Sequence, residues 1–260
     1  MSEGYVGVEG GRLWHERRGE GFPVLLLHPD LWDVRIWDDQ FDGFAEHHDV
    51  VRYDRRGHGR SDPPRGSYSA LRDLRTLLAE LAIDRCALVG CAGGARLALD
   101  FAIAYPDAAD AVVAVSPEVT GYRWNDPGVD LLARQVREAV AAGDLAGAVE
   151  VQLAVWAPVA SAADPRVRAI AMANAGVLLF GEDLAEAPSS AVARLGDVQA
   201  AMLVVVGDRD LAEIQAIADL IVGAVPGASK RVVAGADQLV NIAKREKFDR
   251  LVLDFLAFRM

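Results

Sequence analysis

The sequence has few cysteines, few basic residues and no long apolar run. Its 260 residues include only two cysteines, too few for a disulfide framework. No apolar stretch reaches the roughly 18 residues that a membrane-spanning helix needs, and the first residues do not resemble a signal peptide. Twenty-seven basic against 38 acidic residues give a net charge of −11, which argues against a nucleic-acid or anionic-membrane surface. These absences favour a cytoplasmic domain with neither nucleic acid nor membrane among its partners.

Histidine is also absent from most of the chain. All five histidines stand in the first quarter of the sequence: His15, His28, His47, His48 and His58. No metal-ligand spacing, phosphate-binding loop or dinucleotide-binding glycine pattern occurs. We therefore expect neither a metal ion nor a cofactor.

Short apolar runs alternate with helical patterns along most of the chain. A hairpin is predicted around Gly10-Gly11, and buried strands are predicted in FPVLLLHP and at 49–53, 86–89, 111–115, 202–206 and 231–234. Helices are predicted at 37–47, 70–82, 94–104, 211–222 and 245–258. This alternation is typical of an α/β protein with a mostly parallel central sheet covered by helices on both faces.

One long segment breaks the alternation. Residues 117–198 carry helical patterns and no convincing strand. We interpret them as a helical cap inserted into a core formed by 1–116 and 199–260, the whole being one structural unit. Within the cap, APVASAAD is predicted to be a turn between helices.

The sharpest motif is a strand, a tight glycine turn and a helix, in ALVGCAGGARLALDFA. Gly90 and Gly94 flank Ala92 at a distance of two residues, which is the spacing of a nucleophile elbow. The centre of such a turn has a strained backbone and needs small neighbours. Hydrolases place a nucleophile there, but the methyl group of Ala92 cannot attack a carbonyl.

Five segments together carry a family resemblance: LLLHPDLWDVRIWDDQF, RYDRRGHGRSDPP, LVGCAGGARLALDFA, LVVVGDRD and VVAGADQLVNIAKREKFDRLVLDFL. Their content and order resemble the α/β-hydrolase superfamily, especially small bacterial esterases and lactonases of the 3-oxoadipate enol-lactonase type. The resemblance spans essentially the full length and implies the α/β-hydrolase fold.

The resemblance also locates the three triad positions. The acid position, in a G-x-x-D pattern, corresponds to Asp210, and the histidine position corresponds to Gln238. Glutamine cannot take a proton from a nucleophile near neutral pH. Because triad order in this fold is serine, acid, histidine, no histidine of this chain can replace it. Ala92 and Gln238 are thus interpreted as vestiges of a degenerate triad.

Two side chains near these positions have alternative interpretations. Cys91 is either a packed thiol or a substitute nucleophile, and packing is favoured because no histidine is predicted beside it. Asp210 is either a vestige that hydrogen-bonds Gln238 and local amides, or a general base whose pKa is raised by burial.

The loop after FPVLLL corresponds to the family's oxyanion-hole loop. There the chain reads His28-Pro29-Asp30, and the resemblance implies a hole formed with the amide of Gly93. A carboxylate at Asp30 would repel a developing oxyanion unless it were protonated or turned away, so Asp30 is a second acid/base candidate. His28 either lines the hole or braces the loop. Trp32 and Trp124 are candidates for lining an apolar pocket.

These observations favour an enzyme that has lost serine hydrolysis. A lyase, cyclase, isomerase or dehydratase needs an enclosed pocket and an acid/base carboxylate but no nucleophile. The substrate would be a small, largely apolar metabolite. Two alternatives remain open: a non-catalytic protein that binds a small ligand, and an inactivated esterase or lactonase.

Overall fold

The computed structural model describes residues 2–180, 184–186 and 190–257 of the chain. Three short stretches of the predicted elements lie outside these residues: 181–183 and 187–189 of the predicted cap, and residue 258 of the predicted C-terminal helix. The other predicted strands and core helices are present within about three residues of their expected bounds.

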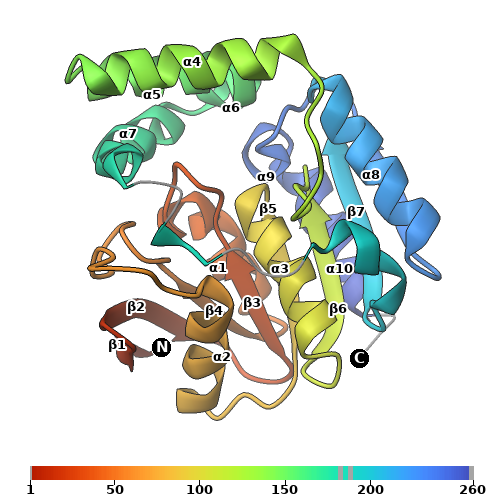
Figure 1. Cartoon of the computed structure of the whole chain (residues 1–260). Helices are drawn as coiled ribbons and strands as arrows, with labels where there is room; N and C mark the ends of the chain where they lie inside the picture. Colours follow the sequence, from red (N-terminus) through yellow and green to blue (C-terminus); the bar gives the residue numbers. More distant parts are fainter. Residues whose placement is uncertain (1, 181–183, 187–189, 258–260) are drawn as a thin grey trace.

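An eight-stranded sheet forms the centre of the molecule (Figure 1). The strands are β1 (Ser2–Val8), β2 (Gly11–Arg18), β3 (Pro23–Leu27), β4 (Asp49–Tyr53), β5 (Cys86–Cys91), β6 (Ala109–Val115), β7 (Ala201–Gly207) and β8 (Ser229–Val233). Their order in the sheet is β1-β2-β4-β3-β5-β6-β7-β8. Strand β2 pairs antiparallel with β1 and β4, and all pairs from β4 to β8 are parallel.

Helices cover both faces of the sheet, as predicted, because the parallel strands are apolar on both sides. One apolar cluster unites the sheet with α2 (Ala70–Glu80), α3 (Gly93–Ala104) and α8 (Ala212–Ala224). A second cluster on the other face includes α1 (Asp38–Phe44), α9 (Val240–Ala243) and α10 (Arg245–Ala257). The carboxyl ends of β3 and β5 lie side by side, so the loops that follow them meet.

The segment between β6 and β7 is largely helical, with α4 (Pro127–Ala141), α5 (Leu145–Trp156), α6 (Pro158–Ala163), α7 (Pro165–Ala173), and 3-10 helices η2 (Ala175–Leu179) and η4 (Val192–Asp197). Figure 1 shows α4 to α7 gathered at one end of the molecule. Residues of α5, α6 and α7 join the apolar cluster that contains Ala92. That this segment acts as a cap remains a prediction.

The prediction of a turn in APVASAAD is wrong, because these residues include helix α6. Pro158 opens the helix at a position where its missing amide costs nothing. The carboxylate of Asp237 accepts hydrogen bonds from the amides of Val159 and Ala160 at 2.6 and 3.0 Å. A side chain about 78 residues further along the chain thus replaces a local helix cap.

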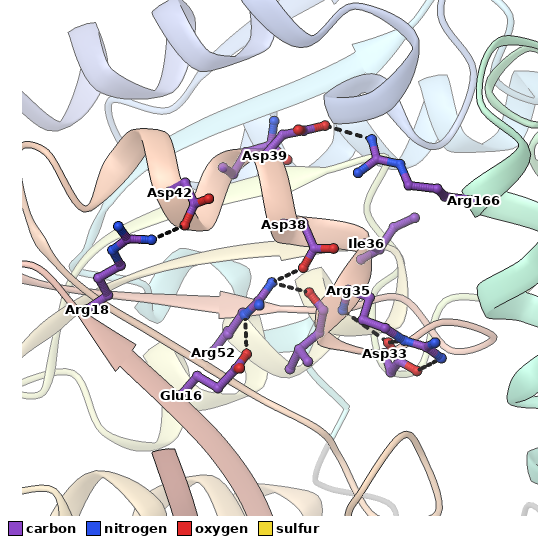
Figure 2. A network of polar contacts seen from close by, with 12 residues as sticks. Glu16, Arg18, Asp33, Arg35, Ile36, Asp38, Asp39, Asp42, Arg52 and Arg166 are labelled. Atoms are coloured by element: carbon purple, nitrogen blue, oxygen red, sulfur yellow. Dashed lines mark hydrogen bonds and ion pairs between the residues drawn. The ribbon is translucent and has the colours of Figure 1, made fainter. Parts of the chain in front are cut away.

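A network of ion pairs fixes the 3-10 helix η1 (Val34–Trp37) and helix α1 to the sheet (Figure 2). The buried guanidinium of Arg52, on β4, donates to Glu16 at 2.7 Å, to Asp38 at 2.6 Å and to the carbonyl of Val34 at 3.0 Å. Arg166 at the start of α7 pairs with Asp39 at 2.9 Å and ties the inserted helices to α1.

Candidate active site

The elbow keeps its strained backbone although its centre is alanine. Ala92 has φ 48° and ψ −115°, a conformation that costs about 1–3 kcal/mol for a residue with a side chain. A Cβ on Gly94 would lie 2.2 Å from the Leu27 carbonyl oxygen, and one on Gly90 would lie 2.4 Å from that of Gly94. The two glycines are therefore required by close backbone approach, and Ala92 stands at the centre of a complete nucleophile-elbow turn.

Asp210 is held at the acid position by two donors. Its Oδ2 accepts from Ser116 Oγ at 2.7 Å and from the amide of Gly207 at 2.8 Å. Burial raises the pKa of Asp210 to about 6, and the two hydrogen bonds oppose that rise. The carboxyl group therefore exchanges a proton close to neutral pH, as a general acid or base must.

Gln238 is buried beside the elbow, and none of the hydrogen bonds among the described residues joins it to Asp210. Its residue is 4% exposed, and its backbone carbonyl accepts from Cys91 Sγ at 3.4 Å. Within the described part of the chain, its side-chain amide makes no recorded hydrogen bond. The interpretation of Asp210 as a vestige predicted hydrogen bonds with Gln238 and with local amides. The amide of Gly207 does donate to Asp210, but Ser116, which directly follows β6, donates in the place of Gln238.

The Cys91 thiol is buried inside the sheet. Burial raises its pKa well above the usual range, and the charges of Asp210, Glu118, Asp30 and Asp237 raise it further. A thiol with so high a pKa does not form the thiolate that attacks a substrate. The geometry fits the interpretation of Cys91 as a packed side chain.

Asp30 lies against the first residue of the elbow helix. A Cβ on Gly93 would stand 2.1 Å from Asp30 Oδ2, so the carboxylate occupies that space. Asp30 Oδ1 lies 3.0 Å from Arg55 Nη1 and 3.7 Å from Arg96 Nη2. Partial desolvation opposes ionisation, but the charges of Arg55, Arg96 and His58 outweigh it and hold the pKa of the half-exposed Asp30 carboxyl group at about 2. Asp30 is therefore ionised, and its carboxylate lies beside Gly93.

His28 lies beneath this loop and is fully buried. Its Nδ1 lies 2.8 Å from the carbonyl of Pro29, and its Nε2 accepts from the amide of Arg55 at 2.9 Å. Burial and the charge of Arg55 keep its pKa well below the ordinary value. Both nitrogens of the neutral ring therefore have hydrogen-bond partners in the backbone. This fits a histidine that stabilises the loop, and not one that lines the oxyanion hole.

The two predicted pocket tryptophans have different surroundings. Trp32 is buried in the cluster that contains Ala92, and its Nε1 donates to the carbonyl of Val167 on α7 at 2.9 Å. Trp124 packs edge-on against Tyr122 and Trp156, with centroids 5.9 and 6.0 Å apart. Trp32 therefore joins the inserted helices to the elbow region, whereas Trp124 belongs to an aromatic group with α5.

Three charged residues of the site were missed by the sequence reasoning. Arg55, in the loop after β4, contacts Asp30 through its Nη1. Arg96, in the first turn of α3, also pairs with Glu118 at 3.1 Å. Burial and the charge of Asp30 raise the pKa of Glu118 to about 7, against the effect of Arg96 and Arg55. The sequence signals that could have identified them are their positions: Arg96 follows the elbow directly, and Glu118 follows strand β6.

Replacing Ser116 should shift the titration of Asp210 upward. The hydroxyl donates to the ionised carboxylate, so Ser116→Ala should raise the pKa of Asp210 above about 6, by about one to two units. Because a raised pKa favours the protonated folded state, the variant should also lose more stability than the wild type as pH rises from about 4 through 7. Carbon-13 NMR of the carboxyl group measures the titration. Ser69→Ala serves as the control. An unchanged pKa of Asp210 in Ser116→Ala would contradict this account.

Comparison with known proteins assigns the chain to a family. The profile of the alpha/beta hydrolase family matches residues 24–250. The chain belongs to this family.

Curated relatives match only in part. The chain is 33% identical over 112 residues to an uncharacterized protein of Mycobacterium tuberculosis, covering 42% of this chain and 33% of the relative. It is 34% identical over 114 residues to epoxide hydrolase 4 of Mus musculus, covering 40% of this chain and 31% of the relative. The chain thus spans about a third of the length of these relatives.

Solved structures match over the full length. An N-acyl homoserine lactone degrading enzyme, Est816, superimposes with a TM-score of 0.80 at 25% identity, covering 97% of this chain and 100% of the other. The enol-lactonase from Burkholderia xenovorans LB400 gives a TM-score of 0.82 at 23% identity, covering 98% and 100%. The second likeness supports the fold alone.

None of the helices described is long and apolar enough to cross a membrane. Nor does the described part of the chain contain a group of three or more His, Cys, Asp and Glu side chains placed to hold a metal ion.

Proposed function

We propose that this protein is an enzyme of the alpha/beta hydrolase family that no longer hydrolyses through a serine. It instead catalyses proton transfer, in a reaction of lyase, cyclase, isomerase or dehydratase type. The substrate is a small, largely apolar metabolite bound near the elbow beneath α5 to α7. No cofactor is needed, and the enzyme works in the cytoplasm.

The observation that carries this proposal is the environment of Asp210. A carboxyl group with a pKa of about 6 is mostly ionised at neutral pH, where it can accept a proton, and it keeps a protonated fraction of roughly a tenth that can donate one. The elbow turn is intact, and the Ala92 methyl at its centre offers no nucleophile. A hydrolase site with its acid retained, and without serine and histidine, is suited to proton transfer and not to acyl transfer.

The two predicted acid/base carboxylates have different roles in this proposal. Asp210 exchanges the proton because its pKa lies near the working pH. Asp30, with a pKa of about 2, is a weak base that stays charged and orients the ligand. The two pKa values differ because of their surroundings. Burial raises the pKa of Asp210, and only a neutral hydroxyl and an amide oppose it. At Asp30 two arginines stabilise the ionised form and lower the pKa.

Asp210→Asn should abolish turnover while leaving binding intact. The metabolite is identified by incubating the purified protein with a bacterial metabolite extract in D₂O and following deuterium uptake or conversion by mass spectrometry. Loss of the acid/base group should slow that reaction by about 10²–10⁴-fold. Asp110→Asn serves as the matched control, because Asp110 lies near the start of β6, at the opposite end of the strand from Ser116. A metabolite that binds but is never converted or exchanged by the wild type would favour the binding-protein alternative.

A further inference from the structure

The Asp30 carboxylate lies beside the first residue of the elbow helix, whose backbone amide is a hydrogen-bond donor in a hydrolase of this fold. Gly93 is the first residue of α3, where backbone amides have no partner within the helix. In a hydrolase such an amide receives the oxyanion of the substrate. Here the carboxylate packs against Gly93, on the side where a Cβ would project.

The two oxygens of Asp30 have different surroundings. Both arginine contacts are made by Oδ1, at 3.0 Å from Arg55 and 3.7 Å from Arg96. Oδ2 faces Gly93. The Asp30 side chain is 50% exposed, so this oxygen belongs to an accessible group.

An ionised carboxylate accepts hydrogen bonds and donates none. The arginines favour the ionised form, and the low pKa of Asp30 follows from their charges. Negative charge also dominates the neighbouring strand end, since Asp210, Glu118, Asp30 and Asp237 together raise the pKa of the Cys91 thiol. A carbonyl oxygen or a carboxylate placed beside Oδ2 would meet repulsion, whereas a hydroxyl or ammonium group would meet an acceptor.

We propose that Asp30 adds a hydrogen-bond acceptor beside the oxyanion position of the elbow, and that the ligand presents a hydroxyl or a protonated amine to Oδ2 beside Gly93. The ligand is therefore an alcohol or an amine at the end that enters the elbow, and not an ester or a carboxylate. This proposal rests on the proposed function only in taking the elbow as the ligand site.

Three probes with the same apolar tail test the proposal: 1-butanol, butylamine and butyrate. Proton–nitrogen NMR spectra at pH 8 follow the amides of Gly93 and Gly94 during titration with each probe. Butylamine, protonated at this pH, and 1-butanol should shift these amides in a saturable manner, and butyrate should not. Asp30→Asn should weaken butylamine binding by about tenfold or more, because a charge-assisted hydrogen bond is lost, and should allow butyrate to bind. The stronger of the first two probes identifies the donor as hydroxyl or ammonium.

Asp110→Asn is again the matched control, since it removes a carboxylate paired with Arg85 without touching the elbow. Asp30→Ser is a second variant with the same expected reversal. The proposal is overturned if butyrate binds the wild type as tightly as butylamine does, if both Asp30 variants retain wild-type butylamine affinity, or if no probe shifts the two glycines. None of these outcomes depends on turnover, so they are independent of the Asp210→Asn result.

Discussion

Wild-type protein should hydrolyse p-nitrophenyl acetate no faster than buffer, whereas Ala92→Ser/Gln238→His should gain at least about 100-fold in kcat/KM over it. Loss of triad members costs about four to six orders of magnitude in serine hydrolases, which sets the upper limit of the gain. The elbow backbone at Ala92 is already in the strained conformation, so a serine would be presented without rebuilding the turn. The Asp210 carboxylate stands at the acid position.

Each single substitution should gain almost nothing. A serine without a base is not activated, and a histidine without a nucleophile has no proton to take, so the triad residues act as a unit. Asp210→Asn in the double variant should remove the gain. Esterase activity in the unmodified wild type, well above buffer, would contradict the proposed loss of hydrolysis.

Asp30 should limit the gain of the double variant. Removing one oxyanion donor costs about 10²–10³-fold in a serine protease, and an ionised carboxylate beside Gly93 opposes the same developing charge. Adding Asp30→Asn should therefore raise the activity by a further roughly 10- to 100-fold. Equal rates with and without this third substitution would show that the carboxylate does not face the reacting oxygen.

The elements of the core could be predicted because their signals are local. A short apolar run bounded by turn residues indicates a strand, and an apolar period of 3.6 residues indicates a helix. Strands β3 to β8 and their helices could therefore be predicted from the sequence. The elbow followed from the spacing of Gly90 and Gly94, since backbone contact at both positions excludes a side chain. The family resemblance implied that Asp30 lies near Gly93, and the two residues meet because the adjacent parallel strands β3 and β5 end at one edge of the sheet.

The remaining features depend on contacts between distant segments. Ser116, and not Gln238, holds Asp210, because the pairing of β6 with β7 brings their ends together, and no local pattern encodes that register. Helix α6 was missed because Asp237 satisfies its first amides from far along the chain. A cluster of charges surrounds Asp30 and consists of Arg55, Arg96 and Glu118. These residues come from separate loops and helices whose relative positions the sequence alone does not show.

Arg52→Met should destabilise the fold far more than Arg18→Met, although both remove an arginine from an ion pair drawn in Figure 2. Arg52 is 9% exposed and bridges Glu16, Asp38 and the Val34 carbonyl, so its loss leaves the buried Glu16 carboxylate without compensation. Breaking such a buried pair costs about 3–5 kcal/mol in the free energy of unfolding. Arg18 and Asp42 are 47% and 67% exposed, and an exposed pair contributes at most about 1 kcal/mol. Urea denaturation of the three proteins measures the difference.

A second substitution separates the cost of the unpaired charge from the loss of the other Arg52 contacts. If the penalty comes mainly from the stranded carboxylate, Glu16→Gln/Arg52→Met should recover at least half of the stability lost by Arg52→Met. If it comes mainly from the Val34 carbonyl and Asp38, the double variant should be no more stable than the single one. In that case the 3-10 helix η1 would be loosened, and the loop that carries Asp30 precedes it directly. The NMR chemical shift of the Gly93 amide would then differ between Arg52→Met and the wild type in the absence of ligand. If only Glu16 were left unpaired, that chemical shift would be the same in both proteins.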